Sequence, residues 1–300
     1  MTKRARQKQI KLWVEGARLR TLPLAVAPIA IGAGAAASVQ KFNLGLTLLA
    51  LAVALFLQIG VNYANDYSDG IRGTDNNRVG PLRLTGSKSV RPVAVKYAAF
   101  AFFALAAIAG LIIVLLTQHW WFLVVGAAAI TAAWYYTGGK SPYGYAGLGE
   151  VSVFIFFGLV ATYGTAFIQI GHYSETALIG GVASGLFASA VLMVNNIRDL
   201  DLDRHVGKRT LAVLVGRKAA KAIYFFLIYL PFAILLPIAL VYPATFLAMF
   251  ALLLVLPITL IVATAQSAKE LILALKLTSF AALGFGLLLG WGLATVNFAL

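Results

Sequence analysis

The sequence predicts an all-α membrane protein: a polytopic bundle of about nine transmembrane helices with two long, Asp-rich cytoplasmic loops. Hydrophobic residues make up 61% of the chain and charged residues 11%, and the mean hydropathy is +0.89. In an ordinary soluble domain about a quarter of the residues are charged. Apolar runs of about 20 residues, each able to cross roughly 30 Å of hydrocarbon, fill most of the sequence. We therefore expect a single membrane domain over residues 1–300.

Nine apolar segments are candidate spans. They cover residues 21–38, 44–63, 93–117, 120–137, 151–170, 176–194, 219–241, 244–265 and 278–297. The first resembles a signal peptide, because basic residues precede it and Ala35, Ala36 and Ala37 resemble a cleavage site. The eight further spans favour a first helix that is retained in the mature protein.

Basic residues predict the orientation. Nine spans place the two termini on opposite sides of the membrane. If the N-terminus is cytoplasmic, Lys41 alone among the 24 Lys and Arg residues falls on the outer side, as the positive-inside rule requires. We expect a bacterial cytoplasmic-membrane protein whose N-terminus and long loops are cytoplasmic and whose C-terminus is external. This topology explains the net charge of +14 better than nucleic-acid binding does.

The composition restricts the chemistry of any site. The chain has no cysteine, which excludes disulfides, iron–sulfur clusters and thiol nucleophiles. Its three histidines are too dispersed for a zinc site. Any metal here should therefore have oxygen ligands.

Acidic residues concentrate in the two long loops, which we expect at residues 65–92 and 196–218. Six of the ten acidic residues lie there: Asp66, Asp69, Asp75, Asp199, Asp201 and Asp203. Long loops commonly carry function. The loops also resemble each other, since Asn65 precedes Asp69 by four residues as Asn195 precedes Asp199. We interpret them as duplicated half-sites, around residues 62–92 and 195–218.

Helical spacing groups these polar residues. On a continuing helix, Asn195, Asp199 and Asp203 share one face, as do Asn62, Asp66 and Asp69. Asp201 points about 200° away from Asp199 on a helix that advances 100° per residue. Like charges on one face repel each other, and a bound cation would offset that repulsion. Carboxylates suit magnesium, which shares its ligands with water and phosphate oxygens.

The sequence therefore predicts a site for magnesium and a diphosphate between the two half-sites. The candidate metal ligands are Asp66, Asp69, Asp75, Asp199 and Asp203. The candidate contacts to the diphosphate or to a second substrate are Asn62, Asn65, Arg72, Arg78, Arg83, Asn195, Lys208 and Arg209. The connection over residues 138–150 contains Lys140 and Tyr143. It is either a tight hairpin with interfacial tyrosines or a further contact to the substrates.

These motifs resemble the UbiA superfamily of intramembrane prenyltransferases, whose two motifs read NDxxDxxxD and DxxxD. Here they appear as Asn65 to Asp69 and as Asp199 to Asp203, with Gly73 where a third Asp of the first motif would stand. Within the superfamily the sequence is most similar to the MenA branch, the 1,4-dihydroxy-2-naphthoate prenyltransferases of menaquinone synthesis. The shared stretches are NYANDYSDGIRGTD, YTGGKSPYGYAGLGE, NNIRDLDLDRHVGKRTLAV and the opening RLRTLP.

The resemblance implies a magnesium-dependent transfer of a polyprenyl group from its diphosphate to 1,4-dihydroxy-2-naphthoate, with loss of the ring carboxylate, to give demethylmenaquinol. The residues expected to take part in catalysis are Asp69, Asp199, Asp203 and Lys140. Two alternatives remain open at this point. One is a related prenyltransferase that uses phytyl diphosphate or another aromatic acceptor. The other is a secondary transporter, although the aspartates lie at helix ends rather than at mid-membrane.

Overall fold

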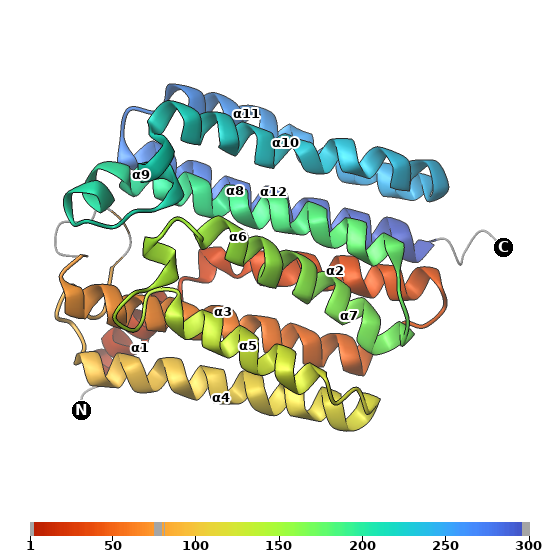
Figure 1. Cartoon of the computed structure of the whole chain (residues 1–300), viewed down its shortest axis with the longest axis horizontal. Helices are drawn as coiled ribbons and strands as arrows, with labels where there is room; N and C mark the ends of the chain where they lie inside the picture. Colours follow the sequence, from red (N-terminus) through yellow and green to blue (C-terminus); the bar gives the residue numbers. More distant parts are fainter. Residues whose placement is uncertain (1–2, 75–79, 81, 296–300) are drawn as a thin grey trace.

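The computed structural model describes residues 3–74, 80 and 82–295, and all regular structure in this part of the chain is helical. The long helices lie side by side and form one bundle (Figure 1). In chain order the elements are α1 (Lys3–Ala17), η1 (Leu19–Thr21), α2 (Pro23–Ser38), α3 (Leu44–Arg72), α4 (Pro92–Thr117), α5 (Phe122–Tyr135), η2 (Tyr143–Tyr145), α6 (Gly149–Val153), η3 (Phe154–Val160), α7 (Ala161–Ile170), α8 (Glu175–His205), α9 (Leu211–Val215), α10 (Arg217–Val241), η4 (Pro243–Ala251), α11 (Leu252–Thr264) and α12 (Ala268–Ala294).

The helices confirm a multi-span integral membrane protein. Among the described residues, seven helical stretches are long and apolar enough to cross a bilayer, and there are eight if the bent pair Gln7–Thr21 and Pro23–Ser38 is one span. That pair bends by 48°. The remaining predicted span, residues 120–137, corresponds to α5, which is apolar but only 14 residues long, fewer than the roughly 20 that a full span needs.

Helices α3 and α8 extend beyond their apolar runs, so the predicted loops begin later than the sequence suggested. Helix α3 continues to Arg72 and ends at Gly73, whose φ of 76° is left-handed. Helix α8 continues to His205, and Gly207 follows with a φ of 75°. The loop boundaries predicted at residues 65 and 196 are therefore wrong. Hydropathy falls at these positions, but the polar side chains are buried against neighbouring segments and the helices continue.

Helix α12 begins ten residues before the predicted span. Ser267 caps it: its hydroxyl accepts from the Glu270 backbone N–H, and the Glu270 carboxylate accepts from the Ser267 backbone N–H at 2.8 Å. This capping box starts the helix ahead of the apolar run. The charges of Lys269, Glu270 and Lys276 obscure the helix in a hydropathy reading.

Glycines allow the helices that frame the site to pack closely. A Cβ on Gly34 of α2 would lie 2.2 Å from the Gly290 carbonyl oxygen of α12. A Cβ on Gly158 of η3 would lie 2.4 Å from the Gly185 Cα of α8. Small residues at such contacts are typical of membrane helix bundles, where dispersion contacts replace the hydrophobic driving force.

One end of the bundle gathers the polar segments. The C-terminal ends of α3 and α8, the η2 connection and α1 lie at the same end (Figure 1). The α2–α3, α4–α5 and α7–α8 connections lie at the opposite end, where α12 also finishes. The polar residues of the two half-sites are thereby brought together although about 130 residues separate them in the sequence.

Candidate active site

A polar cavity lies between α3 and α8, and α3 supplies a row of polar side chains to its wall. These residues are Gln58, Asn62, Asn65 and Asp69, at i, i+4, i+7 and i+11. Their spacing places them on one helical face. The face differs from the predicted one in a single position, because Asn65 lines the cavity where Asp66 was expected.

Asp69 is the acidic member of this row and is buried, with 3% of its surface exposed. The Tyr145 hydroxyl donates to its Oδ1 at 2.8 Å, and the Arg83 guanidinium lies 3.8 Å from its Oδ2. Burial, and secondarily the nearby Asp69 carboxylate, raise the pKa of Tyr145, so the phenol remains a donor. Asp69 therefore has a hydrogen-bond donor and a cationic side chain as its neighbours.

Asp66 has a different environment. Its Oδ2 accepts from the Leu84 backbone N–H and its Oδ1 from the Thr85 backbone N–H, both at 2.8 Å. It is fully buried. The segment that follows the first motif is therefore tied to α3 by this carboxylate, and the tie brings Arg83 beside Asp69.

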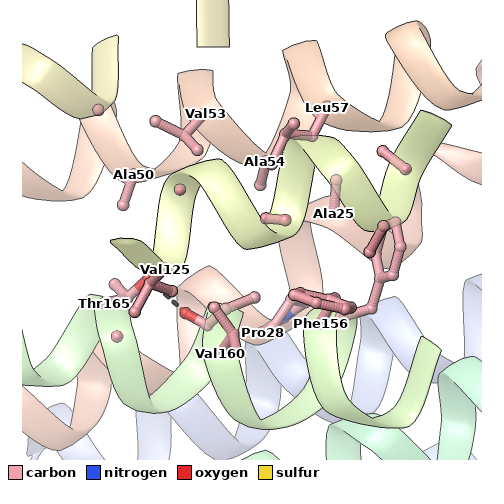
Figure 2. A pocket seen from close by; sticks show the side chains of 18 of the residues that line it. Ala25, Pro28, Ala50, Val53, Ala54, Leu57, Val125, Phe156, Val160 and Thr165 are labelled. Carbon is pink, nitrogen blue, oxygen red and sulfur yellow. Dashed lines mark hydrogen bonds between the residues drawn. The ribbon is translucent and has the colours of Figure 1, made fainter. Parts of the chain in front are cut away.

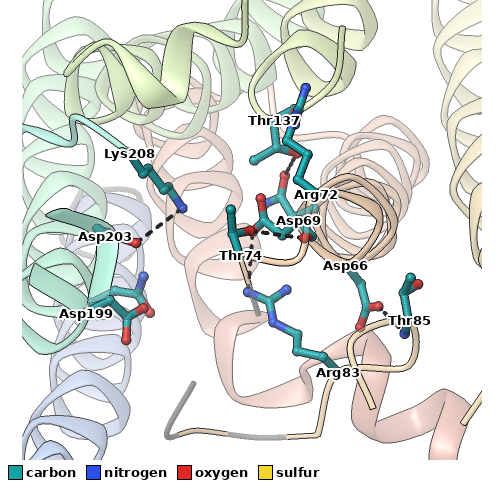
Figure 3. A network of polar contacts seen from close by, with 12 residues as sticks. Asp66, Asp69, Arg72, Thr74, Arg83, Thr85, Thr137, Asp199, Asp203 and Lys208 are labelled. Atoms are coloured by element: carbon teal, nitrogen blue, oxygen red, sulfur yellow. Dashed lines mark hydrogen bonds and ion pairs between the residues drawn. The ribbon is translucent and has the colours of Figure 1, made fainter. Parts of the chain in front are cut away.

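Helix α8 presents its carboxylates from the facing side of the site (Figure 3). The Arg198 guanidinium donates two hydrogen bonds, of 2.7 and 2.6 Å, to the Asp199 carboxylate, and a third to the side-chain oxygen of Asn195. Lys208 lies 3.9 Å from Asp203. Both aspartates are 6% exposed.

Asp201 behaves as its helical angle predicts. Its side chain is 79% exposed and pairs with Arg217 at 2.6 Å. Asp199 and Asp203, two residues to either side, are buried. The burial pattern thus separates the outward-facing acid from the two that face inward.

The structure brings together most of the predicted site residues, but not all. The polar cavity is lined by Asn62, Asn65, Asp69, Arg83, Asn195 and Lys208. The predicted ligands Asp199 and Asp203 are buried on the facing helix but do not line the cavity themselves. Arg72 instead donates to the backbone carbonyls of Thr137 and Gly139, while Lys140 and Arg209 are exposed. Tyr143 lines a different, apolar cavity. Asp75 and Arg78 lie outside the described residues.

Sequence reasoning missed several residues of the site. Arg18 and Tyr136 line the polar cavity. Tyr145 links the half-sites, since its hydroxyl bonds Asp69 and its ring lies 4.9 Å from the Lys208 ammonium. Buried Glu150 accepts from the Asn196 side chain at 2.9 Å. Tyr136, Tyr145 and Glu150 lie in or next to the predicted connection over residues 138–150, so their proximity in sequence was a signal, but their partners depend on tertiary packing. Arg18 lies between α1 and η1, away from every predicted site segment.

An apolar groove adjoins the polar cavity. It is lined mainly by aliphatic, small and aromatic residues of α2, α3, α4, α5 and the η3–α7 segment, including Ala25, Pro28, Val53, Val125 and Phe156 (Figure 2). Val61, Tyr136, Val153 and Phe157 line both spaces. The two spaces therefore lie next to each other at these four residues, which we call the junction residues.

The donor set fits magnesium that is shared with a phosphate ligand. Within the described part of the chain, no three His, Asp or Glu side chains converge to hold a metal by themselves. Magnesium commonly takes one or two carboxylates and completes its shell with water and substrate phosphates. Asp69 on one side and Asp199 and Asp203 on the other provide that number on each side (Figure 3).

Comparison with known proteins agrees with this arrangement. The chain matches the UbiA prenyltransferase family over residues 25–272. It is 45% identical to the 1,4-dihydroxy-2-naphthoate octaprenyltransferase of Mycobacterium tuberculosis, over 71% of this chain and 72% of that protein. The octaprenyltransferase of the same name from Escherichia coli is 36% identical over 70% of each.

Solved structures share the fold. A UbiA homolog from Archaeoglobus fulgidus, bound to GPP and Mg2+, aligns with a TM-score of 0.68 at 14% identity over 95% of this chain and 99% of that one. An apo UbiA homolog from Aeropyrum pernix aligns with a TM-score of 0.64 at 19% identity over 90% and 96%. Family match, sequence identity and fold together lead to one conclusion: this chain belongs to the UbiA prenyltransferase family.

Proposed function

We propose that this chain transfers a polyprenyl group from polyprenyl diphosphate to 1,4-dihydroxy-2-naphthoate, with decarboxylation to demethylmenaquinol, as a step of menaquinone biosynthesis. Four relatives named 1,4-dihydroxy-2-naphthoate octaprenyltransferase are 34–45% identical to it over 70–78% of the chain. The observation that carries the proposal is the junction between a polar cavity and an apolar groove. A prenyl diphosphate has the same two-part character.

The diphosphate would lie at the Asp69 end of the polar cavity. Arg83 and Lys208 line the cavity there and are the natural contacts to phosphate oxygens. Asp69, Asp199 and Asp203 would hold magnesium, which when bound supplies positive charge to the departing diphosphate. Two predicted metal ligands are not assigned to the metal. Asp66 would instead fix the segment that carries Arg83, and Asp75 lies outside the described residues.

The chain's own residues would stabilise the charge that forms. As the bond between C1 and the bridging oxygen breaks, its electron pair leaves with the diphosphate, and Arg83 and Lys208 face the growing negative charge. A π-electron pair of the naphthoate ring forms the new carbon–carbon bond. The carboxylate leaves as CO2, and the electron pair of its bond to the ring stays with the ring. Val61, Tyr136, Val153 and Phe157, which line both spaces, would exclude water from the allylic cation.

The apolar groove would hold the isoprenoid tail. Its lining residues carry no formal charge, and the polar ones among them are Tyr136, Tyr143, Ser152 and Thr165. The Tyr143 hydroxyl is already engaged with the Ala132 carbonyl and with Ser152. A hydrocarbon chain that enters the groove therefore does not deprive this hydroxyl of its hydrogen bonds.

We infer that the aspartate end of the bundle faces the cytoplasm. The connection that contains Lys41 lies at the opposite end (Figure 1). The strong bias of the other basic residues toward the aspartate end then follows the positive-inside rule. The naphthoate and the charged diphosphate head of the prenyl donor would reach the site from that side.

The test is an assay of the purified protein with 1,4-dihydroxy-2-naphthoate and prenyl diphosphates of several lengths, with product masses recorded. The expected product is the prenylated, decarboxylated naphthalene diol. A product formed only with phytyl diphosphate, or only with a benzoate acceptor, would reassign the substrate. Absence of any prenylated aromatic product would refute the proposed function.

A further inference from the structure

Arg18 stands out among the cavity-lining residues by its backbone. It lies between α1 and η1 with φ 54° and ψ 58°, a left-handed conformation that residues with a Cβ rarely adopt. Contacts on both sides hold it there. The Arg18 carbonyl accepts from the Thr21 backbone N–H at 2.8 Å and from the Thr21 hydroxyl at 2.9 Å, and the Ala17 carbonyl accepts from Asn62 at 2.9 Å. Backbone strain that is fixed in this way clusters at functional sites.

The Arg18 guanidinium has an unused donor. Its Nη2 atom is buried and has no hydrogen-bond partner among the described residues. A buried, unsatisfied donor is costly, and more so when it is charged. Because Arg18 lines the polar cavity, a ligand there can supply the missing acceptor. The planar fork of a guanidinium matches a carboxylate.

The position of Arg18 separates it from the diphosphate end. Among the described residues that line the cavity, the cations are Arg18, Arg83 and Lys208. Arg83 lies against Asp69, and Lys208 against Asp203. Arg18 instead belongs to the turn that is bonded to Asn62, seven residues before Asp69 and so about 10 Å away along the axis of α3. The cavity thus has a second cationic position, on the turn that contacts Asn62.

We propose that Arg18 binds the carboxylate of the aromatic acceptor. This assignment rests on the proposed function, which supplies an acceptor that is an aromatic acid. With the diphosphate at Asp69 and the tail leaving past Val61 and Phe157, an acid held by Arg18 has its ring beside the C1 atom that must be attacked. Arg18 is a substrate-binding residue in this scheme.

The ion pair between Arg18 and the acceptor carboxylate also distinguishes substrate from product. When the bond between the ring and the carboxylate breaks, its electron pair stays with the ring and neutral CO2 leaves. The prenylated product has lost the group that Arg18 binds. The ion pair therefore exists with the acid acceptor and not with the product, which favours exchange of one for the other.

The experiment compares wild type with Arg18→Gln and Arg18→Lys on two acceptors, 1,4-dihydroxy-2-naphthoate and 1,4-dihydroxynaphthalene, under anaerobic conditions. The diol lacks the carboxylate and loses a ring proton where the acid loses CO2. Arg18→Gln should raise KM for the acid about 10- to 100-fold, the range for a hydrogen bond to a charged group. KM for the diol and KM for prenyl diphosphate should stay within about twofold. Arg18→Lys should restore part of the loss.

Arg91→Gln is the matched control, because Arg91 is exposed and does not line either space. An unchanged KM for prenyl diphosphate shows that Arg18→Gln is folded. A rise in KM for prenyl diphosphate, or an equal loss with acid and diol, would overturn the assignment. Calorimetric titration of both acceptors into wild type and Arg18→Gln separates the two hypotheses: a wild type that binds the acid through Arg18 but does not prenylate it refutes the proposed function alone.

Discussion

The Tyr145 hydroxyl donates a 2.8 Å hydrogen bond to Asp69, and so joins the η2 connection to the first aspartate motif. The same ring lies 4.9 Å from the Lys208 ammonium and 5.4 Å from the Arg72 guanidinium carbon. Lys208 in turn pairs with Asp203 of the second motif. One tyrosine therefore connects both half-sites, and it orients the carboxylate that we expect to bind magnesium.

Tyr145→Phe should retain the ring and remove the hydrogen bond to Asp69. We expect kcat to fall by about 10- to 100-fold, since a hydrogen bond to a charged group contributes about 1.5–3 kcal/mol. The raised pKa keeps the wild-type phenol protonated above pH 10, so the ratio of wild-type to variant rates should be the same at pH 7 and pH 9.5. A ratio that disappears at pH 9.5 would contradict this role. Steady-state kinetics at both pH values measure it.

Removal of divalent metal should abolish turnover. The carboxylates of Asp69, Asp199 and Asp203 are buried near the cavity, and cations are needed to bring a diphosphate beside them. Addition of EDTA should stop product formation and excess magnesium should restore it. Full activity in chelator would refute a metal-assisted mechanism.

The aspartates should divide into two classes. Asp69→Asn removes a buried charge from the cavity wall, and Asp199→Asn and Asp203→Asn each remove a buried charge from the facing helix. Turnover should fall by about 10²-fold or more in each, as when transition-state charge stabilisation is lost. Asp201→Asn should retain most activity, because that side chain is 79% exposed and pairs with Arg217. The measurement is the turnover of the four variants, compared at equal amounts of protein in the membrane. Equal loss in all four would contradict the assignment.

Gly126 should limit the tail length. A Cβ at Gly126 would meet nothing within 4 Å, and the residue lines the apolar groove ten residues before Tyr136, about 15 Å along α5. Gly126→Leu should fill the groove and lower kcat/KM for long prenyl diphosphates, while short ones remain substrates. Gly284→Leu is the control, since Gly284 also faces open space but does not line the groove. An identical length profile in both variants would show that the tail lies elsewhere.

The topology should place the aspartate end in the cytoplasm. A reporter fused after Leu300 should be external, and one inserted at exposed Gly207, after α8, should be cytoplasmic. The two fusions together show whether the number of spans between Gly207 and Leu300 is odd or even. A cytoplasmic reporter at both positions would mean that one of the three spans after Gly207 does not cross the membrane. An external reporter at Gly207 with a cytoplasmic one after Leu300 would mean that an earlier span, such as α5 with its 14 residues, does not cross.

The sequence by itself determined the class of the protein and the identity of most motif residues. Apolar runs that are long enough to cross a bilayer indicate directly that the helices lie in lipid, because few charged residues are tolerated there. The helical repeat likewise predicted that Asp201 faces away from Asp199 and Asp203, and burial confirms this. These properties depend on residues close together in the chain.

Only the tertiary structure decided which polar groups meet. Asp66 and Asn65 are neighbours in sequence, yet Asp66 bonds the Leu84 and Thr85 backbone while Asn65 lines the cavity. The contacts of Tyr145 with Asp69, and of Asn62 with the turn at Arg18, join segments 76 and 45 residues apart. Local periodicity gives the direction of a side chain on its own helix. The partner that it meets depends on how the helices pack, and packing is set by many weak contacts along their whole length.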